Sequence, residues 1–248
     1  MQLSTVIIAR DEADRIANTI KAALQISQEV LVLDTGSSDK TIEVATNAGA
    51  RVMSCQWQGY GPTKNYAYTF AKYDWILSLD ADEVPSSALI SSIKELTPEV
   101  DHIYTVNRLI NFLGQDIYHC KWHPDWVPRL FHRSLAKWNH AAVHEKLLFP
   151  DHIKLQKLEG ILHHYSFRSR QHFVDKTAEY SKLAAEEWIA EGKSPGLFKS
   201  LIGPWWKYVQ TYYQFGGYKD GTAGKEIAKI LADGVRTKLE YYRRLKKG

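Results

Sequence analysis

The chain of 248 residues has only two cysteines, Cys55 and Cys120, too few for a disulfide scaffold or a four-thiolate metal site. No apolar run approaches the roughly 18 residues of a membrane-spanning helix. The start, MQLSTVIIARDE, has neither a basic leader nor a cleavable apolar segment. Internal repeats and low-complexity stretches are also absent. We therefore expect a globular cytoplasmic protein that is neither exported nor threaded through a bilayer.

The first part of the chain has few basic residues relative to acidic ones, and the second part has few acidic residues relative to basic ones. Residues 1–100 carry 13 acidic and 8 basic side chains, whereas residues 101–248 carry 15 acidic and 24 basic ones. A basic end is typical of proteins that meet nucleic acid or an anionic membrane, but also of a solvated helix face. The two parts are therefore expected to face different partners.

Alternating patterns in the first hundred residues predict an α/β fold. Short β-branched runs at Leu3–Ala9, Glu29–Asp34, Arg51–Cys55 and Asp74–Asp80 predict buried strands. Between and after them, helical spacing predicts helices from Asp14 to Leu24, Thr41 to Ala48, Thr63 to Lys72 and Pro85 to Leu96. This rhythm implies a mainly parallel sheet with helices on both faces, and ligands in such sheets bind beyond the carboxyl ends of the strands.

The second part of the chain has a different organisation. Residues 101–162 predict aromatic-rich strands and hairpins. Helical spacing then returns at 169–190, at 197–213 with an interruption at Gly203-Pro204, and in a last helix that follows the FGGYKDGTAG turn. We predict a catalytic domain over residues 1–168, divided into halves 1–100 and 101–168, and a helical region over residues 169–248.

Carboxylates follow three of the predicted strands, and the most informative are those of Asp80-Ala81-Asp82. Residues i and i+2 of an extended chain point to one side, so both carboxylates can face a crevice at the strand end. Hard oxygen ligands suit Mg²⁺ or Mn²⁺, which bind through carboxylates and substrate phosphates. Alternatively, Asp82 caps the helix that follows.

Several segments match a known family in order along the chain. They are VIIARDEADRI, VLVLDTGSSDKT, QGYGPTKN, LSLDADE and VPRLFHR followed by VHEKL. The chain resembles inverting family-2 glycosyltransferases of the GT-A fold over roughly residues 1–165. It most resembles the bacterial lipopolysaccharide inner-core glucosyltransferases, which add glucose to a heptose of the lipid-anchored core. The resemblance implies a GT-A sheet with a C-terminal helical extension, a UDP-sugar donor, a lipid-linked saccharide acceptor, and Mg²⁺ or Mn²⁺.

The resemblance also assigns a nucleotide-sugar site. It places uracil and ribose at Ala9, Arg10, Asp11 and Glu12, the base-contacting carboxylate at Asp34, and the ribose or metal at Asp80-Ala81. Asp82 is the expected direct metal ligand. Gly36 permits close backbone approach, and Lys64 can reach a phosphate as a mobile point charge. Simpler roles stay open: charge at a helix N-terminus for the first acids, an ordinary turn at Asp34, and a solvated Lys64.

An inverting transfer also needs a base that removes the proton of the attacking hydroxyl, usually a carboxylate. The family has an acidic residue in the AAVHEKL segment, which implicates Glu145, and Asp125 is the rival. Glu145 can equally be a strand-edge acid paired with Lys146. His164 matches a third metal ligand of some GT-A enzymes, although a lone histidine is more often structural. Arg129 can pair with a diphosphate or an acceptor phosphate, or form a surface ion pair.

The helical end of the chain carries an aromatic stripe that includes Trp205-Trp206, and it finishes in the basic sequence YYRRLKK. Such helices suit an anionic membrane interface. We expect most of the stripe to pack against the catalytic core and the basic tip to meet the inner membrane as a peripheral contact.

Two other functions are considered. A nucleotidyltransferase uses acidic metal ligands on a similar sheet, but it normally has a glycine-rich basic phosphate loop after the first strand, where ARDEADR is acidic. A nucleic-acid-binding protein would fit the basic, aromatic second half. The acidic first half and the lack of a recognisable nucleic-acid motif disfavour that alternative.

Overall fold

The apolar segments of the first hundred residues form the strands that the sequence predicts, with two of them, β1 and β2, at the predicted bounds. The computed structural model describes residues 1–139 and 146–246. Its elements are β1 Leu3–Ala9, α1 Ile16–Ala23, β2 Glu29–Asp34, α2 Thr41–Asn47, β3 Arg51–Ser54, α3 Tyr60–Thr69, β4 Trp75–Asp80, β5 Glu83–Pro85, α4 Ser87–Glu95, β6 His102–Phe112, β7 Gln115–Asp116, β8 Asp125–His132, β9 Lys137–Trp138, β10 Leu147–Leu148, β11 Lys154–His164, α5 Arg170–Ala190, α6 Leu197–Val209, a π-helix Gln210–Gln214, a 3₁₀ helix Gly217–Asp220 and α7 Gly221–Leu245.

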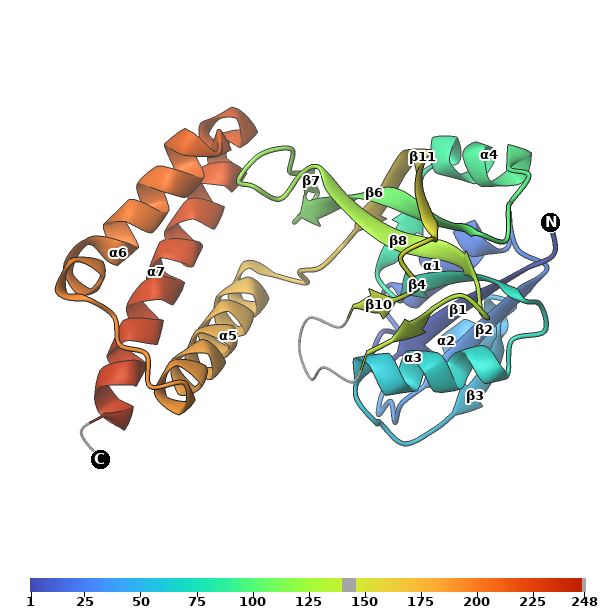
Figure 1. Ribbon diagram of the computed structural model, residues 1–248, viewed down its shortest axis with the longest axis horizontal. Helices are drawn as coiled ribbons and strands as arrows, with labels where there is room; N and C mark the ends of the chain where they lie inside the picture. Colours follow the sequence, from blue (N-terminus) through green and yellow to red (C-terminus); the bar gives the residue numbers. More distant parts are fainter. Residues whose placement is uncertain (140–145, 247–248) are drawn as a thin grey trace. The chain divides into compact units, whose positions relative to one another are not determined.

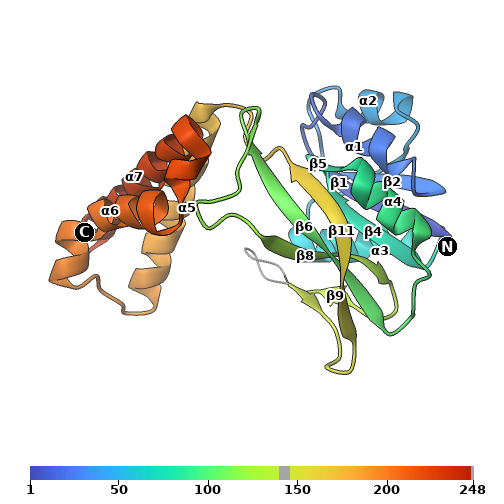
Figure 2. The ribbon, with the colours of Figure 1, turned by 90° about the horizontal axis from the view of Figure 1, so that it is seen from above.

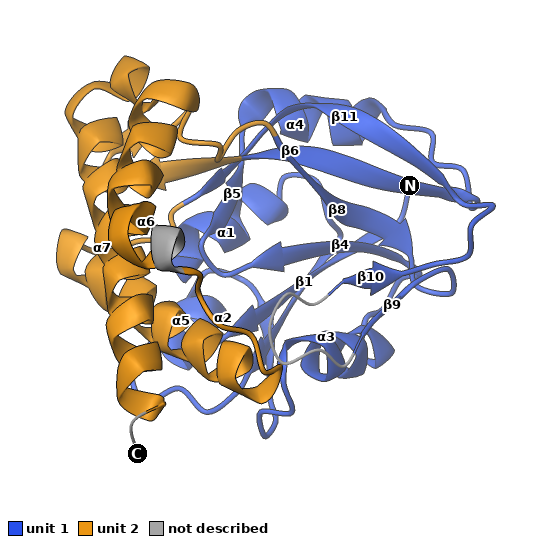
Figure 3. Ribbon diagram, turned by 60° about the vertical axis from the view of Figure 1, so that its left-hand side comes forward, with its two compact units in different colours: residues 1–108, 125–164 blue, residues 109–124, 165–248 orange. Residues whose placement is uncertain are grey.

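The chain divides into two units (Figure 3). Unit 1 comprises residues 1–108 and 125–164, and unit 2 comprises residues 109–124 and 165–248. The segment 109–124 is therefore grouped with the C-terminal helices, although it lies between strands of unit 1 in the sequence.

The sheet has the strand order β3-β2-β1-β4-β8-β6-β11-β5, with β7 paired to β6 (Figure 1). The first four strands run parallel, and β8 pairs antiparallel to β4. The carboxyl ends of β1, β2 and β4 therefore meet at one edge. This mixed sheet with helices, followed by a C-terminal helical region, is the GT-A architecture that the sequence predicts.

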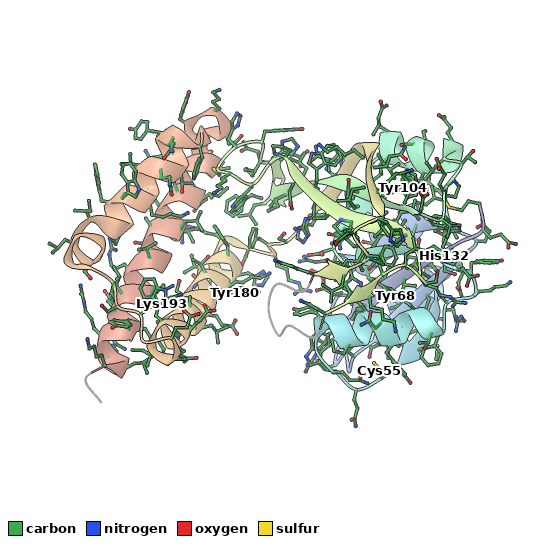
Figure 4. The ribbon with its side chains drawn as sticks, in the orientation of Figure 1. Cys55, Tyr68, Tyr104, His132, Tyr180 and Lys193 are labelled. Carbon is green, nitrogen blue, oxygen red and sulfur yellow. The ribbon has the colours of Figure 1, made fainter. Side chains whose placement is uncertain are left out.

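Helices cover both faces of the parallel half, as predicted (Figure 2). Residues of α1, α2 and α4 pack in one apolar cluster, including Ile16 and Leu89. On the other face α3 contributes Ala67 and Tyr68 to a second cluster (Figure 4). The fully enclosed hydroxyl of Tyr68 is satisfied, because it bonds the Ser78 hydroxyl at 2.8 Å and accepts from the Trp138 indole at 2.7 Å. Both clusters fix the strand ends that carry the carboxylates.

The antiparallel half adds residues from distant parts of the sequence to the same edge. β11 pairs with β5 so that His164 lies opposite Glu83. β6 pairs with β8 so that Arg108 lies opposite Asp125. Long-range pairing of this kind brings basic side chains beside the acidic end of β4.

In unit 2, α7 packs against both α5 and α6 (Figure 1). The apolar stripe of α7 is buried at Ile227, Ile230, Leu239 and Tyr242. No helix in the described part of the chain is both long and apolar enough to cross a membrane.

Two of three expectations for local structure were wrong. The interruption expected at Gly203-Pro204 is absent, because Pro204 removes only one intrahelical hydrogen bond and packing against α7 supports the rest of α6. The expected turn at FGGYKDGTAG is present, with Gly216 in a left-handed conformation and a 3₁₀ helix at Gly217–Asp220, and the last helix begins within the segment at Gly221. The third helix starts at Tyr60 rather than Thr63, since Gly59 adopts a positive φ of 95° and proline is tolerated in a first turn.

The expected packing of the aromatic stripe against the catalytic core stays a prediction. Leu201, Trp205, Trp206 and Tyr213 are exposed.

Candidate active site

Asp82 and His164, the two expected metal ligands, lie side by side. The antiparallel pairing of β5 with β11 brings His164 Nε2 to 3.4 Å from Asp82 Oδ2, and the two side chains are 17% and 18% exposed. Arg15 Nη1 lies 3.7 Å from the same oxygen. Burial acts to raise the pKa of Asp82, but the hydrogen bond and charge of His164 outweigh it, and the pKa is lowered. Asp82 is therefore held as a carboxylate.

This pair fits the donor set of a divalent cation. Adjacent ligands of an octahedral Mg²⁺ ion, each at about 2.1 Å, are about 3 Å apart, close to the observed 3.4 Å. One carboxylate and one imidazole leave several positions for phosphate oxygens and water. Asp82 and His164 are thus the residues that would hold such an ion.

A different group, Glu99, Asp101 and His102, is the only set of three potential metal ligands within the described residues. It lies at the start of β6, whereas Arg108 lies six residues further along the strand, about 20 Å away at strand spacing. His102 Nδ1 bonds Asp101 at 2.8 Å, and Lys154 Nζ lies 3.3 Å from the same carboxylate. These ion pairs explain the group without a metal.

Asp80, at the end of β4, is clamped by two cations. Lys64 Nζ lies 3.2 Å from Oδ1, and Arg129 Nη2 donates to Oδ2 at 2.9 Å. Burial acts to raise the pKa of Asp80, but Lys64 and Arg129 outweigh it and hold that pKa well below its ordinary value. Lys64 is buried in α3, with Nζ 4.5 Å from the Trp138 ring centroid. It is therefore not a solvated lysine, and Arg129 is not in a surface ion pair.

Glu83 is a residue that the sequence reasoning did not select. It is fully buried, and its Oε1 accepts from Arg129 Nη2 at 2.5 Å and from Arg108 Nη1 at 3.3 Å. Its Oε2 accepts from the Asp80 amide at 3.1 Å. The sequence hinted at a role for Glu83 only because it directly follows Asp80-Ala81-Asp82. Its two arginine partners come from other strands, so the sequence did not show them.

An alternating series of charges results: Lys64, Asp80, Arg129, Glu83, Arg108 and Asp125. Arg108 reaches Asp125 Oδ2 through Nη2 at 2.8 Å and Nε at 2.9 Å. The series therefore joins an expected nucleotide-sugar residue to one of the two candidate bases. Glu145, the other candidate, lies outside the described residues.

The ends of β1 and β2 form two interlocked turns. The Asp34 carboxylate accepts from the amides of Gly36 and Ser37 at 2.9 and 3.0 Å, and Gly36 has φ +99°. Asp11 Oδ1 accepts from the Ser38 amide at 2.7 Å, and these bonds lower the pKa of Asp11. Asp34 thus has the ordinary turn role and Asp11 joins its own segment to that turn, which leaves a base-contacting role for Asp34 as a proposal.

The remaining expected residues lie around these turns. Ala9 is buried and its carbonyl accepts from the Thr35 amide at 3.0 Å, while Arg10 is exposed. Glu12 Oε2 lies 3.2 Å from Arg15 Nε. The Ala81 carbonyl accepts from the Thr19 hydroxyl at 2.8 Å, which ties the Asp80–Asp82 turn to α1.

Comparison with known proteins identifies related sequences. Residues 4–148 match the family described as Glycosyl transferase family 2. An uncharacterized glycosyltransferase of Rickettsia bellii is 31% identical over 238 residues, covering 87% of this chain and 79% of the relative. The lipopolysaccharide core biosynthesis glycosyltransferase LpsC of Rhizobium meliloti is 25% identical over 237 residues, covering 90% and 85%.

Among solved structures, a similar one is glucosyl-3-phosphoglycerate synthase of Mycobacterium tuberculosis in complex with Mn²⁺, UDP and glucosyl-3-phosphoglycerate. It has a TM-score of 0.48 and 19% identity, covering 79% of this chain and 81% of that chain.

Proposed function

The chain belongs to glycosyltransferase family 2, and we propose on that premise that it transfers a sugar from a UDP-sugar to a saccharide hydroxyl with inversion at the anomeric carbon. The observation that carries the proposal is the meeting of Asp82 and His164 at 3.4 Å, beside the clamped Asp80. An acidic strand end repels a diphosphate unless cations intervene. The proposal therefore includes a divalent metal held by Asp82 and His164.

When bound, Mg²⁺ or Mn²⁺ supplies Lewis-acid stabilisation of the charge that develops on the departing UDP. The protein's own residues keep that site anionic and fixed. Lys64 and Arg129 hold both oxygens of Asp80, so its carboxylate is fixed in one orientation. Asp80 is proposed to contact the ribose or the metal. Asp34, Gly36 and the Ala9–Glu12 segment form the proposed uracil and ribose site.

The base on the acceptor side is proposed to be Glu145, with Asp125 as the rival. Asp125 already accepts two hydrogen bonds from Arg108 on one oxygen. This pairing favours a positioning role for Asp125, because a base that is free to turn toward the acceptor hydroxyl suits proton transfer better.

For substrates, we propose glucose as the transferred sugar and an inner-core heptose of lipopolysaccharide as the acceptor. The proposal comes from the resemblance of the segments above, and the name of the Rhizobium meliloti relative supports the lipopolysaccharide core. A lipid-linked acceptor would place the enzyme at the cytoplasmic face of the inner membrane as a peripheral protein.

The test measures UDP release by the purified chain with Mn²⁺ and a panel of UDP-sugars. We expect release with UDP-glucose and a loss of at least about a hundredfold in Asp82→Ala, on the scale of removing a charge-stabilising group. Asp101→Ala is the matched control, because it removes a carboxylate from the other acidic group. Unchanged release in Asp82→Ala would refute the proposal, as would an equal loss in the control.

A further inference from the structure

Helix α6 and the π-helix after it expose a row of large apolar side chains. Leu201, Trp205, Trp206 and Tyr213 are 73%, 62%, 50% and 61% exposed, and we call them the α6 ridge. Leu201 and Trp205 are four residues apart and so lie on the same face of α6, and Trp206 is the next residue along the helix. Together they expose on the order of 500 Å² of surface. Patches of this size on soluble proteins often mark binding surfaces.

Helix α6 packs on α7, and Thr211 in the following π-helix is fully buried, but the four side chains of the α6 ridge stay exposed. The ridge is therefore left exposed within unit 2, and tryptophan and tyrosine are the residues that prefer a membrane–water interface.

A basic pocket begins where the ridge ends. It has a volume of ≈ 330 Å³, and its lining includes Lys121, His123 and Lys219 together with Gln214, the residue after the ridge's Tyr213. No acidic side chain of the described residues lines it. Tyr118, which lines the pocket, and Tyr218, next to the lining residue Lys219, are each half exposed and extend the aromatic surface.

Among the described residues, neither Lys121 nor Lys219 forms an ion pair with a carboxylate, and each lies over an aromatic ring: Lys121 Nζ is 5.3 Å from the Phe215 centroid and Lys219 Nζ is 6.0 Å from the Tyr218 centroid. The carboxylate of Asp220, at the end of the 3₁₀ helix, accepts hydrogen bonds from the amides of Tyr118 and His119 and pairs with His119 Nδ1. Lys121 itself has a positive φ of 66°, a conformation that needs such anchoring. Burial and the charge of Lys121 lower the pKa of Lys207, a sign that like charges are crowded here. An anion would relieve this crowding.

We propose that the α6 ridge and this basic pocket together dock unit 2 on the surface of an anionic phospholipid bilayer, with Trp205 and Trp206 in the interface and a lipid phosphate in the pocket. Apolar aromatic side chains beside lysines are the combination that binds such surfaces. The inference rests on the exposed surface of unit 2 and is independent of the proposed sugar transfer. It assigns membrane contact to α6 and its pocket in place of the basic tip of α7.

The experiment measures partitioning of the full chain onto vesicles, either pure phosphatidylcholine or phosphatidylcholine with 30 mol% phosphatidylglycerol. We expect binding to the anionic vesicles only, weakened by salt. Each lysine near such a surface contributes about 1 kcal/mol, so the double variant Lys121→Gln, Lys219→Gln should bind roughly thirtyfold more weakly. The exposed pair Lys21→Gln, Lys94→Gln in unit 1 is the charge-matched control and should bind like wild type.

Two further variants locate the contact. Trp205→Phe, Trp206→Phe keeps apolar surface but should abolish most of the quenching of tryptophan fluorescence by brominated lipid. Arg243→Gln, Arg244→Gln removes two charges from the tip of α7 and should bind like wild type. Equal binding to neutral vesicles, a larger loss in the α7 variant than in the pocket variant, or undiminished quenching in the tryptophan variant would each overturn the proposal. UDP release by the same variants reports on sugar transfer separately.

Discussion

His164 Nε2 lies 3.4 Å from Asp82 Oδ2, although His164 ends β11 and Asp82 lies in the turn between β4 and β5. The contact depends on the antiparallel pairing of β5 with β11, which puts His164 opposite Glu83. A carboxylate that is held ionised beside an imidazole at this spacing is a ready donor set for a hard divalent cation.

The first prediction concerns direct Mn²⁺ binding. Removing one of two protein ligands by Asp82→Asn or His164→Ala should weaken Mn²⁺ affinity at least about tenfold, the lower end of what supporting residues of metal sites contribute. Electron paramagnetic resonance titration in the presence of UDP measures the free ion. Asp101→Asn, in the other acidic group, should leave the titration unchanged. A larger loss of Mn²⁺ affinity in Asp101→Asn than in Asp82→Asn would instead place the metal site at the start of β6.

The second prediction concerns Glu83. Glu83→Gln leaves Arg129 and Arg108 without the carboxylate between them, and breaking a buried ion pair costs about 3–5 kcal/mol. Urea unfolding should show that loss, whereas Asp101→Asn, an exposed pair with Lys154, should change stability by less than about 1 kcal/mol. A Glu83→Gln variant as stable as wild type would show that the buried charges are compensated elsewhere.

Local patterns were sufficient to predict most of the parallel half of the fold. β1 and β2 match their predicted bounds because β-branched runs flanked by turn residues are strong local signals. The pattern did not decide what covers the stripe that includes Trp205 and Trp206, since helical spacing shows which residues share a face but not which partner covers that face.

The candidate site was likewise predicted only in part. Asp80, Asp82 and His164 were selected from strand ends and from the family resemblance, whereas Glu83 and Arg108 were not. Their roles depend on the register of β5, β6, β8 and β11, which joins residues far apart in sequence. Pairing register is a tertiary property that a single sequence does not display.

The third prediction is a pH dependence of stability. Asp80 and Asp82 have pKa values below the ordinary value in the folded state, so the unfolded chain binds protons first as the pH falls. Their contribution is therefore complete above about pH 4 and is lost progressively below it. Urea unfolding between pH 6 and pH 3 should show this decline, and Asp80→Asn should make it shallower. The exposed control Asp151→Asn should keep the wild-type slope. A steeper decline in Asp80→Asn would contradict the assigned sign.

The fourth prediction separates the two candidate bases. If Glu145 removes the acceptor proton, Glu145→Gln should lower the turnover number of transfer by about 10²–10⁴ while the affinity for UDP stays unchanged. Asp125→Asn should act mainly through stability, because Arg108 loses the carboxylate that receives two of its hydrogen bonds. Steady-state transfer, UDP titration and urea unfolding on both variants give the comparison. Since a general base affects the chemical step and an ion-pair partner affects folding, the reverse ranking, with Asp125→Asn inactive but fully stable, would make Asp125 the base.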